Sequence, residues 1–259
     1  MKIAIAVAAL AGLIVPMSAA QAATAAPHDT PPAASTAPAT TAAPVLVARW
    51  NFDAGATAGR VADTSGHGAP ALTARGADQG ALSYEAGPTG GKYVAFPALC
   101  SVGATACPRA MLEAPNDGDL NPGTRLFRWG ATIRVLKSQV RGSSNIMQKG
   151  TNATGSQWKM QIGQKMGRAQ CVVIGVGSPA VYMAHSTNPI TDGAWHKILC
   201  QRSGTTLAIF VDGVQQGTVS VPAAMSISNS MPLRIGGPNF NTSSDMYHGQ
   251  LDDVYAELG

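Results

Sequence analysis

The chain has 259 residues, of which only 12% are charged, and its formal net charge at pH 7 is +4. Such a small positive charge, spread along the chain, excludes the basic surface typical of a nucleic-acid-binding protein. Glycine (29) and proline (17) supply many turns, and no stretch keeps a 3.6-residue apolar period. We therefore expect few helices and no nucleic-acid partner.

The first 22 residues have the three parts of a secretory signal peptide. Lys2 gives a basic start, residues 3–15 form an uncharged apolar run, and residues 19–22 (Ala-Ala-Gln-Ala) form a small-residue cleavage site. As a helix the apolar run reaches only about 20 Å, short of the roughly 30 Å of hydrocarbon in a bilayer. We expect cleavage after Ala22, no transmembrane segment and a secreted protein.

Residues 23–44 consist almost entirely of Ala, Thr and Pro. A segment without large apolar side chains cannot bury enough surface to offset its ordering entropy, so we interpret it as a disordered tether. It either spaces the domain away from a polymer surface or is an inert tail, and its composition favours the tail. Residues 45–259 remain as one domain, a normal size for an all-β sandwich.

Alternating apolar and polar residues recur throughout residues 45–259, as in half-buried β-strands. Asp212-Gly213 separates two such runs and predicts a type I′ hairpin, because both turn residues tolerate positive φ. The predicted fold is all-β, a two-sheet antiparallel jelly-roll sandwich. The expected strands are 45–52, 92–96, 129–135, 157–162, 169–174, 195–202, 207–211, 233–235 and 250–257.

The four cysteines, Cys100, Cys107, Cys171 and Cys200, all lie in the predicted domain. An even number in an exported chain predicts disulfides, and four cysteines allow three connectivities. The short glycine-containing loop between Cys100 and Cys107 favours that pair. Zinc is the alternative, disfavoured because no histidine at ligand spacing accompanies the cysteines.

Several short motifs follow one another along the domain. They are Arg49–Asp53 with Val61–Gly68, Asp192–Ile198, Phe210–Gly213, Pro232–Gly237 and Tyr247–Val254. In this order they resemble the laminin-G-like (concanavalin A-like lectin/glucanase) sandwiches, over nearly the whole of residues 45–259. Residues 146–150 and the later cysteines resemble a subgroup of secreted bacterial laminin-G-like proteins, which implies a Cys171–Cys200 disulfide. Animal laminin-G domains carry their cysteine pair nearer the C-terminus, so their receptor-binding roles do not transfer.

The resemblance also implies a calcium ion that ties the opening loops to the closing strand. The matching positions are Asp53, Asp63 and Asp252, with Asp245 as an alternative, and carboxylate oxygens are the ligands calcium prefers. The competing interpretation is that Asp63 caps a turn and Asp252 pairs with a surface base.

Catalytic motifs are missing from the sequence. Glucanases with the fold that the resemblance implies need two carboxylates on one strand face, written ExDxxE, and no such string occurs. Residues 113–119 hold three acids, but their Pro and Asn predict a solvated turn. His196 is expected to hydrogen-bond a turn rather than act as a general base. We therefore expect no enzymatic activity.

Aromatic residues that could stack on a sugar are few. Trp50, Trp129 and Trp195 lie on strand faces and are expected in the core. The candidates left for ligand contact are Trp158, Tyr182 and Phe240. The predicted function is a secreted, non-catalytic, lectin-like module that binds an extracellular glycan or cell-surface polymer. A polysaccharide hydrolase or lyase of the same fold with an unrecognised active site, and a structural or adhesion protein of the envelope, remain alternatives.

Overall fold

The computed structural model describes residues 43–88, 90–241 and 245–259. The predicted signal peptide 1–22 and nearly all of the predicted tether 23–44 lie outside them. Within the described residues the strands β1 to β16 build two antiparallel sheets, and only short 3-10 turns are helical. This confirms the predicted all-β sandwich. None of the described helical turns is long and apolar enough to cross a membrane.

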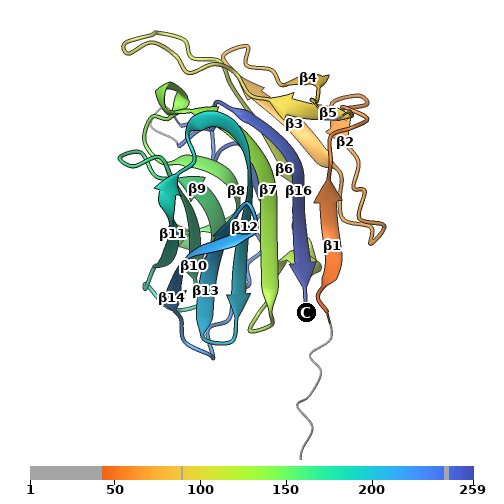
Figure 1. Ribbon diagram of the computed structural model, residues 1–259. Helices are drawn as coiled ribbons and strands as arrows, with labels where there is room; N and C mark the ends of the chain where they lie inside the picture. Colours follow the sequence, from red (N-terminus) through yellow and green to blue (C-terminus); the bar gives the residue numbers. More distant parts are fainter. Residues whose placement is uncertain (1–42, 89, 242–244) are drawn as a thin grey trace, which may run out of the picture. The chain divides into compact units, whose positions relative to one another are not determined.

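The first sheet, sheet A, contains both the first and the last strand of the domain, and Figure 1 shows these strands side by side with their neighbours. Val45 at the start of β1 lies opposite Leu258 at the end of β16. The order is β14 (Val214–Ser220), β13 (Thr206–Val211), β12 (Asp192–Ser203), β7 (Phe127–Leu136), β16 (Gln250–Leu258), β5 (Lys92–Ala95) and β4 (Ser83–Ala86), with β1 (Val45–Trp50) also paired to β16.

The second sheet, sheet B, consists of the remaining strands and packs against sheet A across the core. Its order is β11 (Tyr182–Pro189), β10 (Arg168–Ile174), β9 (Ser156–Ile162), β8 (Ser144–Thr151), β15 (Leu233–Ile235), β6 (Arg109–Ala114), β3 (Leu72–Ala77) and β2 (Arg60–Val61). Strands β2, β3, β4, β6, β8 and β11 are not among the strands expected from alternation, because they are very short or their apolar residues do not alternate regularly with polar ones.

The core between the sheets is centred on three aromatic rings. Phe127 and Trp129 of β7 stack with their centroids 5.4 Å apart, and Trp158 of β9 meets them from the other sheet at 5.2 and 5.7 Å. All three side chains are fully buried. The indole nitrogen of Trp158 donates to the carbonyl of Leu120 at 2.9 Å. The prediction that Trp158 contacts a ligand is therefore wrong, because this ring fills the core, whereas Trp129 and also Trp50 are buried as expected.

Both predicted disulfides are confirmed. Cys171 of β10 and Cys200 of β12 are fully buried and join sheet B to sheet A, with their Cα atoms 5.6 Å apart. Cys100–Cys107 closes a loop between β5 and β6. The predicted hairpin between β13 and β14 is also confirmed, since Asp212 and Gly213 have φ of 52° and 80°.

Candidate functional site

The outer face of sheet B carries a row of polar side chains. Cys171 points into the core because its disulfide reaches sheet A, so the neighbouring residue Gln170 points outward. Directly paired residues of adjacent strands share a face. Gln170 is paired with Gln161 of β9 and with His185 of β11, and Gln161 is paired with Asn145 of β8.

A second row crosses the same face one step along the strands. It consists of Glu113 (β6), Arg234 (β15), Gln148 (β8), Lys159 (β9), Val172 (β10) and Met183 (β11), each paired with the next. We call these two rows together the polar face of sheet B. Its amide, ammonium and guanidinium groups come from strands rather than loops, which holds them at fixed spacing.

Several side chains of the polar face are buried. Although they point away from the core, Asn145, Gln148 and Gln161 are only 2%, 4% and 4% exposed. Asn145 reaches this face through a β-bulge, since the register with β9 shifts between Asn145 and Met147. A bulge inserts one residue into the alternation and so turns the side chain beside it to the other face. The strand is thus bent locally to present Asn145 outward.

Two buried oxygen atoms on this face lack a partner. The amide nitrogen of Asn145 donates to Gln148 Oε1 at 2.6 Å, and that of Gln161 donates to Gln170 Oε1 at 2.6 Å. The carbonyl oxygens Asn145 Oδ1 and Gln161 Oε1 accept no hydrogen bond from the described residues. An unsatisfied buried acceptor costs about 1–3 kcal/mol. The arrangement therefore suits a ligand that donates hydrogen bonds.

Donors flank these acceptors. Arg234 donates from Nε to Glu113 Oε2 at 2.9 Å, and Arg75 lies 3.6 Å from the other oxygen of Glu113. Lys159 is partly buried, and burial lowers its pKa, with Asp245 acting weakly in the opposite direction. Glu113 is the one carboxylate on the described strands of sheet B. The face thus offers donors and acceptors together but no pair of acids.

The other two predicted ligand residues lie beside this face rather than on it. Tyr182 starts β11 opposite Val173, in the register that points inward, and packs partly against the core. Phe240 is half-buried in the segment after β15, and its carbonyl accepts a hydrogen bond from Arg109. The sequence offered one signal for the residues that were missed, the alternation of Gln157, Lys159 and Gln161 along β9.

The predicted calcium ligands are only partly brought together. Asp63 accepts hydrogen bonds from the backbone of Arg49, Ser65 and Gly68 and from the Ser65 hydroxyl, at 2.7–3.3 Å. Its oxygens therefore cap the opening turn, which was the competing interpretation. Among the described residues, no three His, Cys, Asp or Glu side chains are grouped to hold a metal.

Asp53 and Asp252 nevertheless influence one another. Burial raises the pKa of Asp252 to about 6, and repulsion by Asp253 and Asp53 adds to it, while the backbone N–H of Asp253 and the charge of Arg49 act against it. Arg49 pairs with Asp253 at 2.6 Å and supplies the positive charge at this place. Among the described residues these carboxylates do not form a metal-binding group, and calcium at Asp53, Asp63 and Asp252 stays a prediction.

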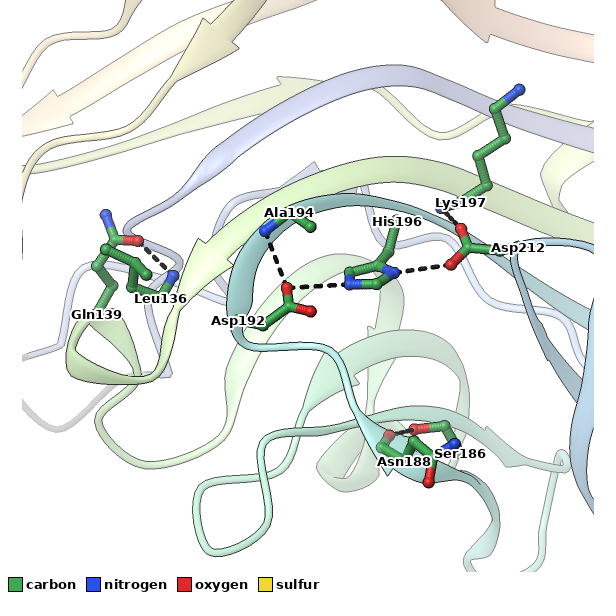
Figure 2. Close-up of polar contacts among 9 residues, drawn as sticks. All are labelled: Leu136, Gln139, Ser186, Asn188, Asp192, Ala194, His196, Lys197 and Asp212. Atoms are coloured by element: carbon green, nitrogen blue, oxygen red, sulfur yellow. Dashed lines mark hydrogen bonds and ion pairs between the residues drawn. The ribbon is translucent and has the colours of Figure 1, made fainter.

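His196 lies between two aspartates, as Figure 2 shows. Its Nδ1 is 2.8 Å from Asp212 Oδ2 and its Nε2 is 3.1 Å from Asp192 Oδ1. The two carboxylates also accept backbone hydrogen bonds from Lys197 and Ala194. Burial disfavours the charged imidazole, but the hydrogen bonds with Asp212 and Asp192 outweigh it and raise the pKa of His196. We call these three residues the His196 clamp.

The comparisons with known proteins agree with this fold. Residues 133–256 match the family model of the concanavalin A-like lectin/glucanases superfamily. The match covers a little under half of the chain. No curated protein matches the sequence.

Solved structures of similar fold include a domain of an extracellular arabinanase and domains of bacterial toxins. One is domain 4 of AbnA, an extracellular GH43 arabinanase from Geobacillus stearothermophilus, determined in complex with arabinotriose. It aligns with a TM-score of 0.61 at 12% identity, over 83% of this chain and 93% of that one. The binding domain of Paraclostridial Mosquitocidal Protein 1 aligns with a TM-score of 0.60 at 13% identity, over 82% and 48% of the two chains.

A third structure is from botulinum neurotoxin type C, whose cell entry depends on interaction with two ganglioside molecules. It aligns with a TM-score of 0.58 at 13% identity, over 83% of this chain and 49% of that one. The chain thus spans about half the length of the two toxin chains. At such low identities these likenesses establish the fold alone.

Two of the laminin-G-like motifs have a structural role. Asp192 and His196 belong to the motif at 192–198, and Asp212 belongs to the motif at 210–213. In the structure they form the His196 clamp, which ties the start of β12 to the turn after β13. The expectation that His196 hydrogen-bonds a turn is confirmed. The superfamily resemblance therefore located the frame of the domain and not its polar face.

Proposed function

We propose that this protein binds carbohydrate on the polar face of sheet B. The observation that carries the proposal is the pair of buried, unpartnered oxygens of Asn145 and Gln161, beside the donors Lys159 and Arg234. A sugar hydroxyl both donates and accepts, so it satisfies both kinds of group. An anion without hydroxyl groups has no hydrogen to give the two oxygens, and a cation is repelled by the ammonium and guanidinium groups. A neutral saccharide fits best.

We propose further that the binding is non-catalytic. Glycoside hydrolysis of the usual kind needs two carboxyl groups about 5–10 Å apart. The described strands of sheet B carry only Glu113, which is held by Arg234 and Arg75. The arabinotriose complex of AbnA domain 4 supports a sugar-binding role for this fold. The two disulfides support an oxidising, extracellular location.

Titration calorimetry with a panel of neutral oligosaccharides tests the proposal: arabinotriose, xylotriose, cellotriose, mannotriose and galactotriose. We expect at least one to bind, and Gln161→Met and Lys159→Met each to weaken it tenfold or more. Gln164→Met, an exposed change in the turn after β9, is the matched control and should bind normally.

The stability of Gln161→Met separates binding from folding. The substitution removes an oxygen that already lacks a partner and one hydrogen bond to Gln170, so the free energy of unfolding should change by no more than about 1 kcal/mol. Undiminished affinity in both Gln161→Met and Lys159→Met would show that the sugar binds elsewhere. Absence of binding across the panel and a wider glycan array would refute the proposal.

A further inference from the structure

The outer face of sheet A, on the opposite side of the sandwich, holds a groove that the proposed function does not use. The groove encloses about 600 Å³ and crosses the strands β13, β12, β7, β16 and β1. Its floor includes two adjacent rows of paired residues, one apolar and one polar, beside a third pair formed by Thr132 and Lys197.

The apolar row is built around Tyr255. Across the strands it runs from Phe210 through Leu199 and Gly130 to Tyr255, each residue paired with the next. A Cβ atom on Gly130 would lie 2.5 Å from Cε1 and Cζ of the Tyr255 ring. Glycine at this position thus lets the ring lie directly across β7. A side chain there would lift the ring off the sheet.

A β-bulge directs Tyr255 to this face. The register between β16 and β7 shifts between Asp252 and Tyr255, so β16 has one extra residue there. Asp253 in the bulge has a φ of 48°, a left-handed conformation that costs energy in a residue other than glycine. Without the extra residue, simple alternation from the inward-facing Leu251 would turn Tyr255 into the core. Two separate features, the bulge and Gly130, therefore place one ring.

The polar row lies next to the apolar row, and its side chains already bind one another. Arg128 donates from Nε to Gln201 Oε1 at 2.6 Å, and its Nη1 is 3.4 Å from Glu257 Oε2. Within the described residues, the Gln201 amide nitrogen and Glu257 Oε1 make no side-chain hydrogen bond. They leave a donor and an acceptor facing the groove at the edge of the aromatic row. At the other end Arg49 pairs with Asp253 at 2.6 Å, and among the described residues Lys197 is the one charged group of the groove without an ion pair.

We propose that this groove is a second saccharide site, so that one domain binds two glycan chains on opposite faces. A sugar ring stacks its apolar face on Tyr255, and its equatorial hydroxyls reach Gln201, Arg128 and Glu257. The paired charges favour a neutral sugar over an ionic ligand. The inference takes its ligand class from the proposed function, but its residues and its face are different.

Stoichiometry is the direct test. Calorimetry with the oligosaccharide of the panel above that binds most strongly should give two sites per chain. Gln201→Met should lower this to one, with Tyr255→Ala as a second variant and Tyr255→Phe, which keeps the ring, retaining two sites. Gln161→Met on the other sheet should also leave one site, and the double variant Gln161→Met/Gln201→Met should leave none.

The patterns distinguish failure of this inference from failure of the proposed function. A single site that Gln161→Met alone abolishes would overturn the second site and leave the first intact. A single site that Gln201→Met alone abolishes would support the groove and overturn the polar face of sheet B. No binding of any oligosaccharide would overturn both.

Cross-linking gives an independent readout. A protein with two sites should make a solution of the matching long polysaccharide turbid, and either single variant should abolish the turbidity at equal protein concentration. If the groove is instead covered by a second copy of the chain, sedimentation would show a dimer that Gln201→Met or Tyr255→Ala dissociates, and the inference would be wrong.

Discussion

The two outer faces of this sandwich differ in how their polar groups are satisfied. On sheet B the amides of Asn145 and Gln161 are almost fully buried, yet their oxygens lack partners among the described residues. On sheet A the guanidinium of Arg128 binds Gln201 and Glu257, and these side chains remain half-exposed. The first face keeps two buried acceptors without a partner, while the second is internally paired around an aromatic ring.

Unpaired hydrogen-bonding groups and cavity shape therefore point to different sites, the first to the polar face of sheet B and the second to the groove on sheet A. The polar face of sheet B is found by asking where buried acceptors go, because leaving them unpaired is costly. The groove on sheet A is found from its volume and from the bulge and glycine that orient Tyr255. In both cases a β-bulge turns the decisive side chain outward, Asn145 on one sheet and Tyr255 on the other.

Removing the disulfide that joins the two sheets should have the largest effect on the free energy of unfolding. Replacing Cys171 and Cys200 by Ala removes a crosslink that spans 29 residues, and loop entropy predicts a loss of about 3.6 kcal/mol in the free energy of unfolding. The same change at Cys100 and Cys107, which are seven residues apart, should cost about 2.5 kcal/mol. Urea unfolding of the two double variants measures both values. A larger loss from the second pair would contradict the ranking.

Filling the space under Tyr255 should affect sheet A selectively. In Gly130→Val the new side chain overlaps the ring, and overpacking of this kind costs about 1–3 kcal/mol. We expect the variant to lose the sheet A site while oligosaccharide binding that depends on Gln161 persists. Thermal unfolding and calorimetry on one sample check both. Retention of two sites in a fully stable Gly130→Val would mean that the ring position is unimportant.

Between pH 5 and 7 the free energy of unfolding should change with pH because of groups on sheet A rather than groups on sheet B. The folded-state pKa values of Asp252, at about 6, and of His196 are both raised. Both groups therefore bind more protons when folded and add stability as pH falls through this range, whereas His248, whose pKa is lowered by burial, acts in the opposite direction. From Asp252 and His196 together we expect a gain of about 1 kcal/mol, a figure discounted for solvent that screens these partly exposed groups.

Two variants show which residue causes each part of this pH dependence. Asp252→Asn should remove the part centred near pH 6, and His196→Gln the part above it. Lys159→Met, on sheet B, serves as the control and should leave the slope unchanged. Urea titrations at each pH measure the free energy of unfolding, and a stability that increases with pH would reverse the predicted sign.

Calcium should give the smallest effect. Asp63 is already bonded to the opening turn, which leaves Asp53 and Asp252 as ligands. A single site that binds only the folded chain adds about 0.4 kcal/mol when calcium equals its dissociation constant. We expect chelator to lower the melting temperature slightly, calcium to restore it better than magnesium, and Asp252→Asn to abolish the response. No change on chelation would end the calcium prediction.

The sequence predicted those parts of the molecule that depend on local pattern. Alternation identified most of the longer strands, the Asp212-Gly213 turn and the buried ring of Trp129. The disulfide between Cys171 and Cys200 followed from the resemblance. Each of these depends on neighbouring residues or on a motif order that can be read along the chain.

The binding faces could not be predicted in this way. A bulge breaks the two-residue period of a strand. Counted by simple alternation, Tyr255 and Asn145 would point into the core, whereas in the structure they point outward. Trp158 was assigned to a ligand and Trp195 to the core, but Trp158 is fully buried and Trp195 is partly exposed against Tyr93. Which face of a strand is covered depends on its partners from distant parts of the chain, and that information is not local.

The pairing of the first and last strands has a mechanical consequence. Val45 and Leu258 lie opposite each other at the same end of the antiparallel pair β1 and β16. A pulling force applied to these two ends acts across the ladder rather than along it, so the hydrogen bonds are loaded one at a time, beginning at the end pair. Under tension the domain should therefore unzip at low force. Tension applied instead between the N-terminal end of β1 and the turn that precedes β16 would shear the whole ladder at once and meet greater resistance.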